Sequence, residues 1–143
     1  MIFTASALTV AAVFAGAALY INAVEQPARL GLDDRALLTE WKPAYKRGTL
    51  MQAPLAFTGF ALGLAAWQIE NQPLAALGAV LIILPWPITF LLIMPTNNRL
   101  ALMPVSEAST ESRALILKWG RLHALRTLAG IGASAAFLSA LST

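Results

Sequence analysis

The chain has 143 residues, of which 58% are hydrophobic and only 12% are charged. Soluble domains carry about 25% charged residues, and the mean hydropathy here is +0.68, so a water-soluble globular domain is excluded. The absence of cysteine excludes disulfides, thiolate metal sites and cysteine nucleophiles. The net charge of +3 forms no basic stripe, so we expect no nucleic-acid partner. We expect residues 1–143 to form a single integral membrane domain.

Four apolar stretches are long enough to cross the hydrocarbon layer, which is roughly 30 Å thick and needs about 20 helical residues. They cover residues 2–24, 50–69, 74–94 and 122–141. The first has no basic residues before it and is longer than the apolar part of a signal peptide, so we interpret it as a retained span. The predicted fold is all-α, an antiparallel bundle of four transmembrane helices with short helices in the two longer loops.

The two longer connections each contain a helix-start signal. After the first span, Asp33 or Asp34 is suited to cap a short helix over residues 36–41. After the third span, Ser109 or Thr110 is a suitable N-cap. A helix that starts there has no breaker before the fourth span, so the two are predicted to be continuous.

Prolines and glycines mark the remaining features. Pro43 and Gly48 are expected to interrupt the first connection. Gly59 and the glycine four residues later match the Gly-x-x-x-Gly pattern of close helix packing, which would also suit a homo-oligomer. The second and third spans are joined by a very short turn, so they are antiparallel neighbours. Pro85 and Pro87 predict a kink or break in the third span.

The basic residues are distributed unevenly along the chain. Nine of the ten lie in the two longer connections, and the tenth, Arg126, begins the last span. The positive-inside rule places such connections in the cytoplasm. We therefore expect an integral protein of the inner, cytoplasmic membrane, with both long loops cytoplasmic and both termini outside the cytoplasm.

This topology brings polar side chains from all four spans to one end of the bundle. Trp119, His123 and Arg126 are spaced i, i+4, i+7, so they share one face of the last helix. Ionisable residues at such a place suggest a functional site. The polar residues expected at this depth are Glu25, Gln52, Asn97, Asn98, His123 and Arg126.

Each of the ionisable residues has two interpretations. His123 and Arg126 form either an interfacial pair, in which the arginine reaches the headgroups, or a buried site with a proton carrier and a charge stabiliser. Glu25 pairs either with Arg29 at i, i+4 or with Arg126 or His123 across the bundle. The second pairing is favoured, because carboxylates within the membrane usually face inward.

The amides and tryptophans are also ambiguous. Asn97 and Asn98 either cap a helix C-terminus, which is the commoner role, or bind a carbonyl or hydroxyl of a ligand. Trp119 fits an interfacial belt, whereas Trp86, between two prolines, fits packing or a pocket wall. With His123 as its one histidine, the chain cannot build a two-histidine metal site, so no metal site is predicted. A haem held by a single histidine is left open.

Four segments together carry a family resemblance. They are residues 24–29, 41–48, 94–100 and 119–126, the last two containing Pro-x-Asn-Asn and Trp-x-x-x-His-x-x-Arg. With these elements the chain resembles the anthrone oxygenase-like family of small four-helix membrane proteins, most of whose bacterial members have no assigned function. The resemblance implies oxidation of an anthrone to an anthraquinone by molecular oxygen, as in fungal and actinobacterial polyketide pathways.

The first functional hypothesis is an oxygenase or oxidoreductase that acts on an aromatic or otherwise lipophilic substrate. In this hypothesis His123 or Glu25 is the base, and Arg126 stabilises an enolate or a superoxide-like partner. Oxygen would be the co-substrate, and the sequence requires neither haem nor metal. The asparagines would orient the substrate carbonyl and the aromatic residues would form walls. The substrate-binding candidates are Asn97, Asn98, Trp119, Tyr20, Gln52 and Trp86.

The alternative hypothesis is a non-enzymatic membrane module that binds a lipid, quinone, haem or protein partner. In that case the polar cluster would hold the loops against the bundle. A channel or transporter is a third interpretation, which the proline break permits. All three hypotheses share membrane lipids as partners, and the first two include a lipophilic small molecule.

Overall fold

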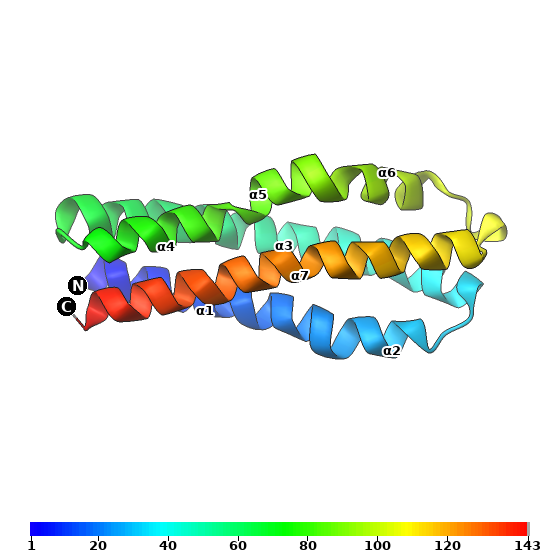
Figure 1. Ribbon diagram of the computed structural model, residues 1–143, viewed down its shortest axis with the longest axis horizontal. Coiled ribbons are helices and arrows are strands. Elements are labelled where there is room, and N and C mark those ends of the chain that lie inside the picture. The colour runs from blue at the N-terminus through cyan, green and yellow to red at the C-terminus, as the bar shows by residue number, and fades with distance from the viewer. Residues whose placement is uncertain (143) are drawn as a thin grey trace.

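The computed structural model describes residues 1–142, and the regular structure in that part of the chain is entirely helical. Four antiparallel segments, each long and apolar enough to cross a membrane, form the predicted bundle (Figure 1). The first consists of α1 (Ile2–Tyr20), a π-helical turn (Ile21–Glu25) and α2 (Gln26–Leu30), and the second is α3 (Asp34–Ile69). The third consists of α4 (Pro73–Ile83), α5 (Pro85–Ile88), a second π-helical turn (Thr89–Ile93) and α6 (Met94–Leu102). A 3-10 turn (Val105–Glu107) leads to the fourth, α7 (Thr110–Leu141).

Both long connections are shorter than predicted, because the polar residues that we expected in loops are part of the flanking helices. Asp33 is the N-cap of α3, as predicted, and its carboxylate accepts a backbone N–H at 2.9 Å. The helix that it caps is not a short one over residues 36–41, and the expected interruption at Pro43 and Gly48 was wrong. Proline is tolerated inside membrane helices where other groups satisfy the freed carbonyl. Ser109 caps α7, which continues unbroken into the fourth span, as predicted.

Proline explains where the first and third segments deviate from α-helix. Pro27 and Pro95 each lie in the first turn after a π-helical turn. Proline lacks an N–H and clashes with the carbonyl four residues earlier, which favours a wider turn just before it. The break predicted at Pro85 and Pro87 is confirmed: α4 ends at Ile83, and α5 steps outward from the bundle (Figure 1).

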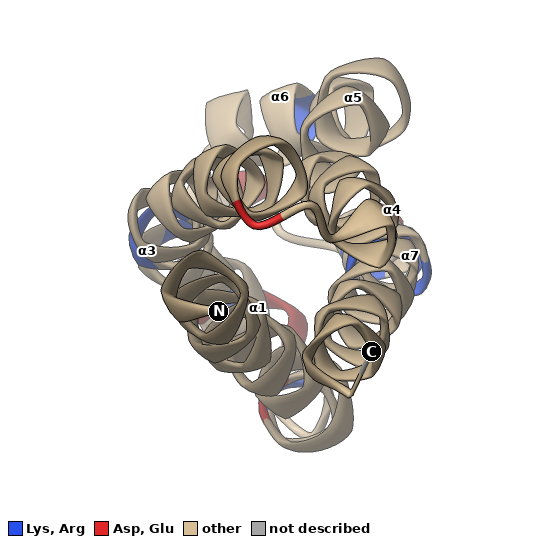
Figure 2. Ribbon diagram, turned by 90° about the vertical axis from the view of Figure 1, so that its left-hand side faces the viewer, with Lys and Arg blue, Asp and Glu red and all other residues tan. Residues whose placement is uncertain are grey.

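The bundle core is made of small residues around a few aromatic rings. The helices follow the order α1, α3, α4, α7 around the axis (Figure 2). The ring of Phe137 on α7 lies 2.8 Å from the point where a Cβ would stand at Gly63, and 2.6 Å from that point at Gly78. A Cβ at Gly59 would lie 3.1 Å from the side chain of Ile82 on α4. The glycine pattern of α3 therefore packs helices of one chain together.

Glu70 fastens the start of α1 at the end of the bundle that carries both termini. Its carboxylate accepts hydrogen bonds from the N–H of Phe3 at 2.9 Å and from the N–H and Oγ1 of Thr4 at 3.0 and 2.7 Å. It also lies 2.7 Å from the Met1 ammonium. Partial burial raises the pKa of this carboxyl, but these partners together lower the pKa to about 2. The short turn that follows, with Asn71 at φ 54°, makes α3 and α4 antiparallel neighbours, as predicted.

Candidate functional site

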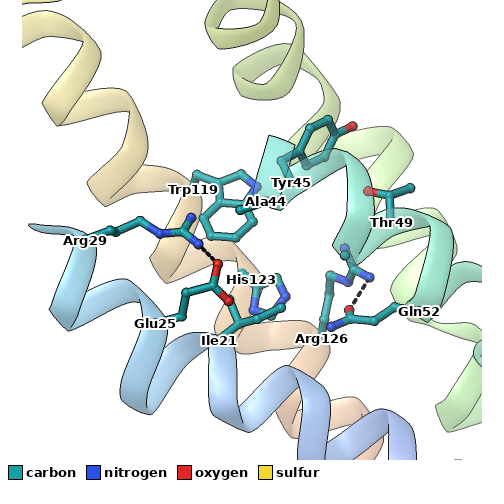
Figure 3. Close-up of a pocket in the computed structure, with 11 residues that line it drawn as sticks. Ile21, Glu25, Arg29, Ala44, Tyr45, Thr49, Gln52, Trp119, His123 and Arg126 are labelled. Atoms are coloured by element: carbon teal, nitrogen blue, oxygen red, sulfur yellow. Dashed lines mark hydrogen bonds and ion pairs between the residues drawn. The ribbon is translucent and has the colours of Figure 1, made fainter. Parts of the chain in front are cut away.

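A small cavity, which we call the polar pocket, lies towards the end of the bundle that carries the polar connections (Figure 3). Its volume is about 20 Å³, roughly the space of one water molecule. The first segment, α3 and α7 all contribute to it, and five of the nine predicted site residues line it. Its walls are Ile21, Glu25, Arg29, Ala44, Tyr45, Gly48, Thr49, Gln52, Trp119, His123 and Arg126.

The imidazole of His123 is held by Asn22, a residue of the first π-helical turn. Asn22 Nδ2 donates to the carbonyl of Gly120 at 2.9 Å, and since a carbonyl only accepts, this bond fixes the orientation of the amide. Asn22 Oδ1 therefore faces His123 Nδ1 at 2.8 Å and accepts from Thr127 Oγ1 at 2.7 Å. It follows that Nδ1 carries the proton and that Nε2 of the neutral ring has the lone pair. Within residues 1–142, Nε2 has no hydrogen-bond partner.

Arg126 is a buried cation, only 9% exposed. Its Nη2 donates to Gln52 Oε1 at 2.7 Å. Among residues 1–142 no carboxylate lies within ion-pair distance of this guanidinium, and its Nε has no partner. Gln52 Nε2 is also buried and unpaired. Buried charges are normally paired, so these donors are suited to the oxygen of an anionic or carbonyl ligand.

Glu25 lines the polar pocket but pairs with Arg29, one helical turn away (Figure 3). The favoured pairing with Arg126 or His123 was therefore wrong. The physical reason is the burial of Arg29, which is 3% exposed and needs its own carboxylate partners. Glu40 is the second of these, with Oε2 at 3.0 Å from Arg29 Nε.

Aromatic rings form one wall of the polar pocket. The centroid of Trp119 lies 5.0 Å from that of His123, and the guanidinium of Arg29 lies 5.7 Å from the Trp119 ring. Trp41 meets Trp119 edge to face at 5.9 Å and stacks on Tyr45 at 4.9 Å. Trp119 and Trp41 are buried, so neither belongs to an interfacial belt. The wall fixes one side of the imidazole.

A second, larger cavity lies beside the polar pocket, between α3 and the broken third segment. We call it the apolar chamber; its volume is about 180 Å³. Trp86 forms part of its wall, with Nε1 at 3.4 Å from the carbonyl of Ala53. Arg126 and Gln52 border both cavities. The walls are Tyr45, Thr49, Gln52, Ala53, Ala56, Pro85, Trp86, Thr89, Phe90, Met94 and Arg126.

Three predicted site residues lie outside both cavities. Asn97 and Asn98 are inside α6 (Met94–Leu102), so the favoured interpretation of a helix C-cap was wrong. The Asn97 side chain is buried, with neither amide atom hydrogen-bonded within residues 1–142, whereas Asn98 is exposed. Tyr20 is 55% exposed and lines an outer groove between α1 and α3.

The main residue that sequence reasoning missed is Asn22, together with its partner Thr127. Asn22 lies four residues after Ala18 and seven after Ala15, both buried, so the 3.6-residue period of the first segment was the available signal for its inward position. No three His, Asp or Glu side chains within residues 1–142 lie close enough together to hold a metal ion.

The family of the chain is shown by comparison. The family model described as anthrone oxygenase matches residues 41–136, about two thirds of the chain. The chain belongs to the anthrone oxygenase family. The matched region of this anthrone oxygenase-like protein includes Gln52, His123 and Arg126, whereas Asn22 and Glu25 precede it.

Two fungal relatives agree with this assignment and with the resemblance carried by the four segments. An anthrone oxygenase of Claviceps purpurea is 30% identical over 129 residues, which cover 79% of this chain and 73% of that protein. The anthrone oxygenase ptaC of Pestalotiopsis fici is 32% identical over 114 residues, 68% of this chain and 79% of that protein. No solved structure matches. Membership of the family gives the protein an oxygenase-like role.

Proposed function

We propose that this protein is a membrane-embedded oxygenase for an aromatic ketone that carries an acidic C–H group, such as an anthrone. The proposal rests on one observation: a candidate base and a buried cation line the same pocket. His123 Nε2 has a free lone pair, and Arg126 is a buried cation without a carboxylate partner. The names of the relatives supply the substrate class.

In the proposed reaction His123 is the base and Arg126 is the charge stabiliser. Nε2 removes a proton from the CH₂ group of the ketone, and the enolate oxygen accepts hydrogen bonds from Arg126 and from Gln52 Nε2. A buried guanidinium with an unpaired Nε stabilises this negative charge more than water would, because it needs no reorganisation. Glu25 neutralises Arg29 in this scheme and is not the base.

The oxidation balances without a further reductant. The enolate carbon transfers electrons to dioxygen and forms a C–O bond, and the imidazolium of His123 returns its proton to the distal peroxide oxygen. The imidazole then removes the remaining C–H proton as the O–O bond breaks, which forms the second C=O group. The leaving hydroxide takes that proton and becomes water. In sum, one CH₂ group and one O₂ become one C=O group and one water.

The proposed orientation places the polar pocket near the cytoplasmic face. Nine of the ten basic residues lie within residues 29–47 and 99–121, in the helical regions next to the connections at that end, which supports a cytoplasmic location by the positive-inside rule. The chain has no native cysteine, so single cysteines at Ser106 and Ser142 test this cleanly. In spheroplasts an impermeant maleimide should label Ser142→Cys and not Ser106→Cys. The reverse labelling pattern would invert the topology.

The functional proposal is tested by oxygen uptake and quinone formation from anthrone. Wild-type protein in liposomes should consume one O₂ per quinone, above the rate in protein-free liposomes. His123→Gln should reduce the protein-dependent rate by about a hundredfold or more. Ser139→Ala, at an exposed position of the same helix, should keep the wild-type rate. An unchanged rate in His123→Gln would reject His123 as the base.

A further inference from the structure

The apolar chamber exists because the third segment leaves the bundle at Pro85. After the break, α5 and the second π-helical turn lie further from the bundle axis than α4 (Figure 1). On the facing side, the part of α3 that lines the chamber includes Ala53 and Ala56, whose side chains are only methyl groups. The small residues and the outward step together leave about 180 Å³ unfilled. By comparison, an apolar protein cavity of about 150 Å³ binds benzene, so the chamber accommodates an aromatic ring.

The inner end of the chamber is cationic and offers unused hydrogen-bond donors. Arg126 and Gln52 border the chamber as well as the polar pocket. Arg126 Nε and Gln52 Nε2 are buried without partners within residues 1–142. The rest of the lining is mainly apolar or aromatic. This combination fits a flat apolar body with one oxygen at its inner edge, since an oxygen there would pair both donors.

The outer end of the chamber is bordered by exposed aromatic side chains. Trp86 is 37% exposed and Phe90 is 59% exposed, and both line the chamber. Their rings meet at 6.1 Å between centroids. Leu91, next to Phe90, is 75% exposed on the same segment. A ligand dissolved in the bilayer would therefore reach the chamber laterally, between α3 and the second π-helical turn.

We propose that the apolar chamber holds the fused aromatic rings of the substrate, which enters from the bilayer core and places one anionic or enolisable oxygen on Arg126 and Gln52. The inference rests on the proposed function for the identity of the reaction, and it adds where the rings of the substrate lie and the route by which the substrate enters. It also means that the rings occupy the apolar chamber and not the polar pocket. The polar pocket, with room for about one water molecule, is too small to hold the rings.

The test measures binding of two probes that cannot undergo the reaction, anthracene carboxylate and methylanthracene, to full-length protein in lipid nanodiscs. Ala53→Phe and Thr89→Trp fill the chamber from opposite walls and should each weaken binding of both probes by about tenfold or more. Ala61→Phe adds the same ring at an exposed position of α3 and should bind like wild type. Arg126→Met should abolish the preference for the carboxylate probe and spare methylanthracene.

Fluorescence energy transfer provides a second measurement, which does not need a substitution that fills the chamber. Transfer from tryptophan to bound anthracene carboxylate should fall clearly in Trp86→Phe, because Trp86 lines the chamber. It should change little in Trp67→Phe, because Trp67 lies near the C-terminal end of α3 and does not line the chamber. Equal transfer in both variants would overturn the proposal. So would probe affinities within twofold of wild type in the folded filling variants.

The outcomes also separate the chamber from the proposed function. If wild-type protein does not oxidise anthrone but the filling variants lose probe binding, the chamber stands and the function is rejected. If the filling variants oxidise anthrone at the wild-type rate, the function stands and the chamber is rejected.

Discussion

Asn22 Oδ1 lies 2.8 Å from His123 Nδ1, and this contact determines which nitrogen of the imidazole is free. The amide cannot be reversed without losing the bond from Nδ2 to Gly120 O. His123 therefore has its proton on Nδ1 when neutral, and its basic nitrogen on the other side of the ring. Asn22 is a positioning residue, because it acts through His123.

Asn22→Leu removes the acceptor and frees the imidazole to adopt either tautomer. Removal of the outer partner of a metal-bound histidine reduces affinity or activity by about tenfold to a hundredfold, and we expect a similar loss of anthrone oxidation when the orienting partner of His123 is removed. The chain has one histidine, so NMR of isotope-labelled histidine reports the tautomer without ambiguity. The wild-type ring should show a proton on Nδ1, and Asn22→Leu a mixture. A wild-type ring protonated on Nε2 would contradict the assignment.

Gly63 allows α3, α4 and α7 to meet around Phe137. Gly63→Ala should lower the free energy of unfolding by about 1–3 kcal/mol, because the added methyl overpacks a filled core. Gly16→Ala is the matched control: nothing lies within 4 Å of a Cβ there, and alanine favours a helix by about 0.5–1 kcal/mol over glycine. Thermal unfolding in detergent measures both. Equal effects of the two substitutions would contradict the packing described.

Glu70 predicts how stability depends on pH. Its pKa falls from the ordinary value of 4.5 to about 2 in the folded protein, so the ionised carboxylate is stabilising. This contribution is fully present above the unfolded-state pKa and is lost as the pH falls through the folded-state value. Glu70→Gln should therefore lower the unfolding midpoint at neutral pH, and the deficit should shrink steadily as the pH falls from 4.5 through 2. The exposed Glu107→Gln serves as the control, and a deficit of Glu70→Gln that stays constant over this pH range would refute this role.

The spans, the caps at Asp33 and Ser109, and the break at Pro85 could be predicted because each depends on local chemistry. The position of Gln52, His123 and Arg126 at one end of the bundle could also be predicted, because the charge asymmetry sets the direction in which each span runs. Hydropathy and charge asymmetry predict the depth of a residue along the bundle. They do not assign rotation about each helix axis.

Rotation is where the predictions were wrong. Asn22 lies four residues after the buried Ala18, on the inward face of the first segment, yet only Glu25 was predicted as a site residue from the first π-helical turn. Burial of Arg29 attracts Glu25 away from His123. The apolar chamber depends on the outward step at Pro85 in three dimensions, which a hydropathy pattern does not contain.

The proposed function implies that Arg126 is kept for catalysis at a cost in stability. A buried arginine without a carboxylate is expensive, and replacing buried charge by an apolar group is often neutral or stabilising by about 1–4 kcal/mol. Removing a donor that stabilises developing negative charge costs about a hundredfold to a thousandfold in rate.

The most direct measurement is therefore made on one preparation of Arg126→Met, comparing its anthrone-dependent oxygen uptake and its unfolding midpoint with those of wild type. We predict a rate lower by about a hundredfold or more, with an unfolding midpoint equal to or above that of wild type. A normal rate with a lowered midpoint would show that Arg126 is structural and would contradict its proposed catalytic role.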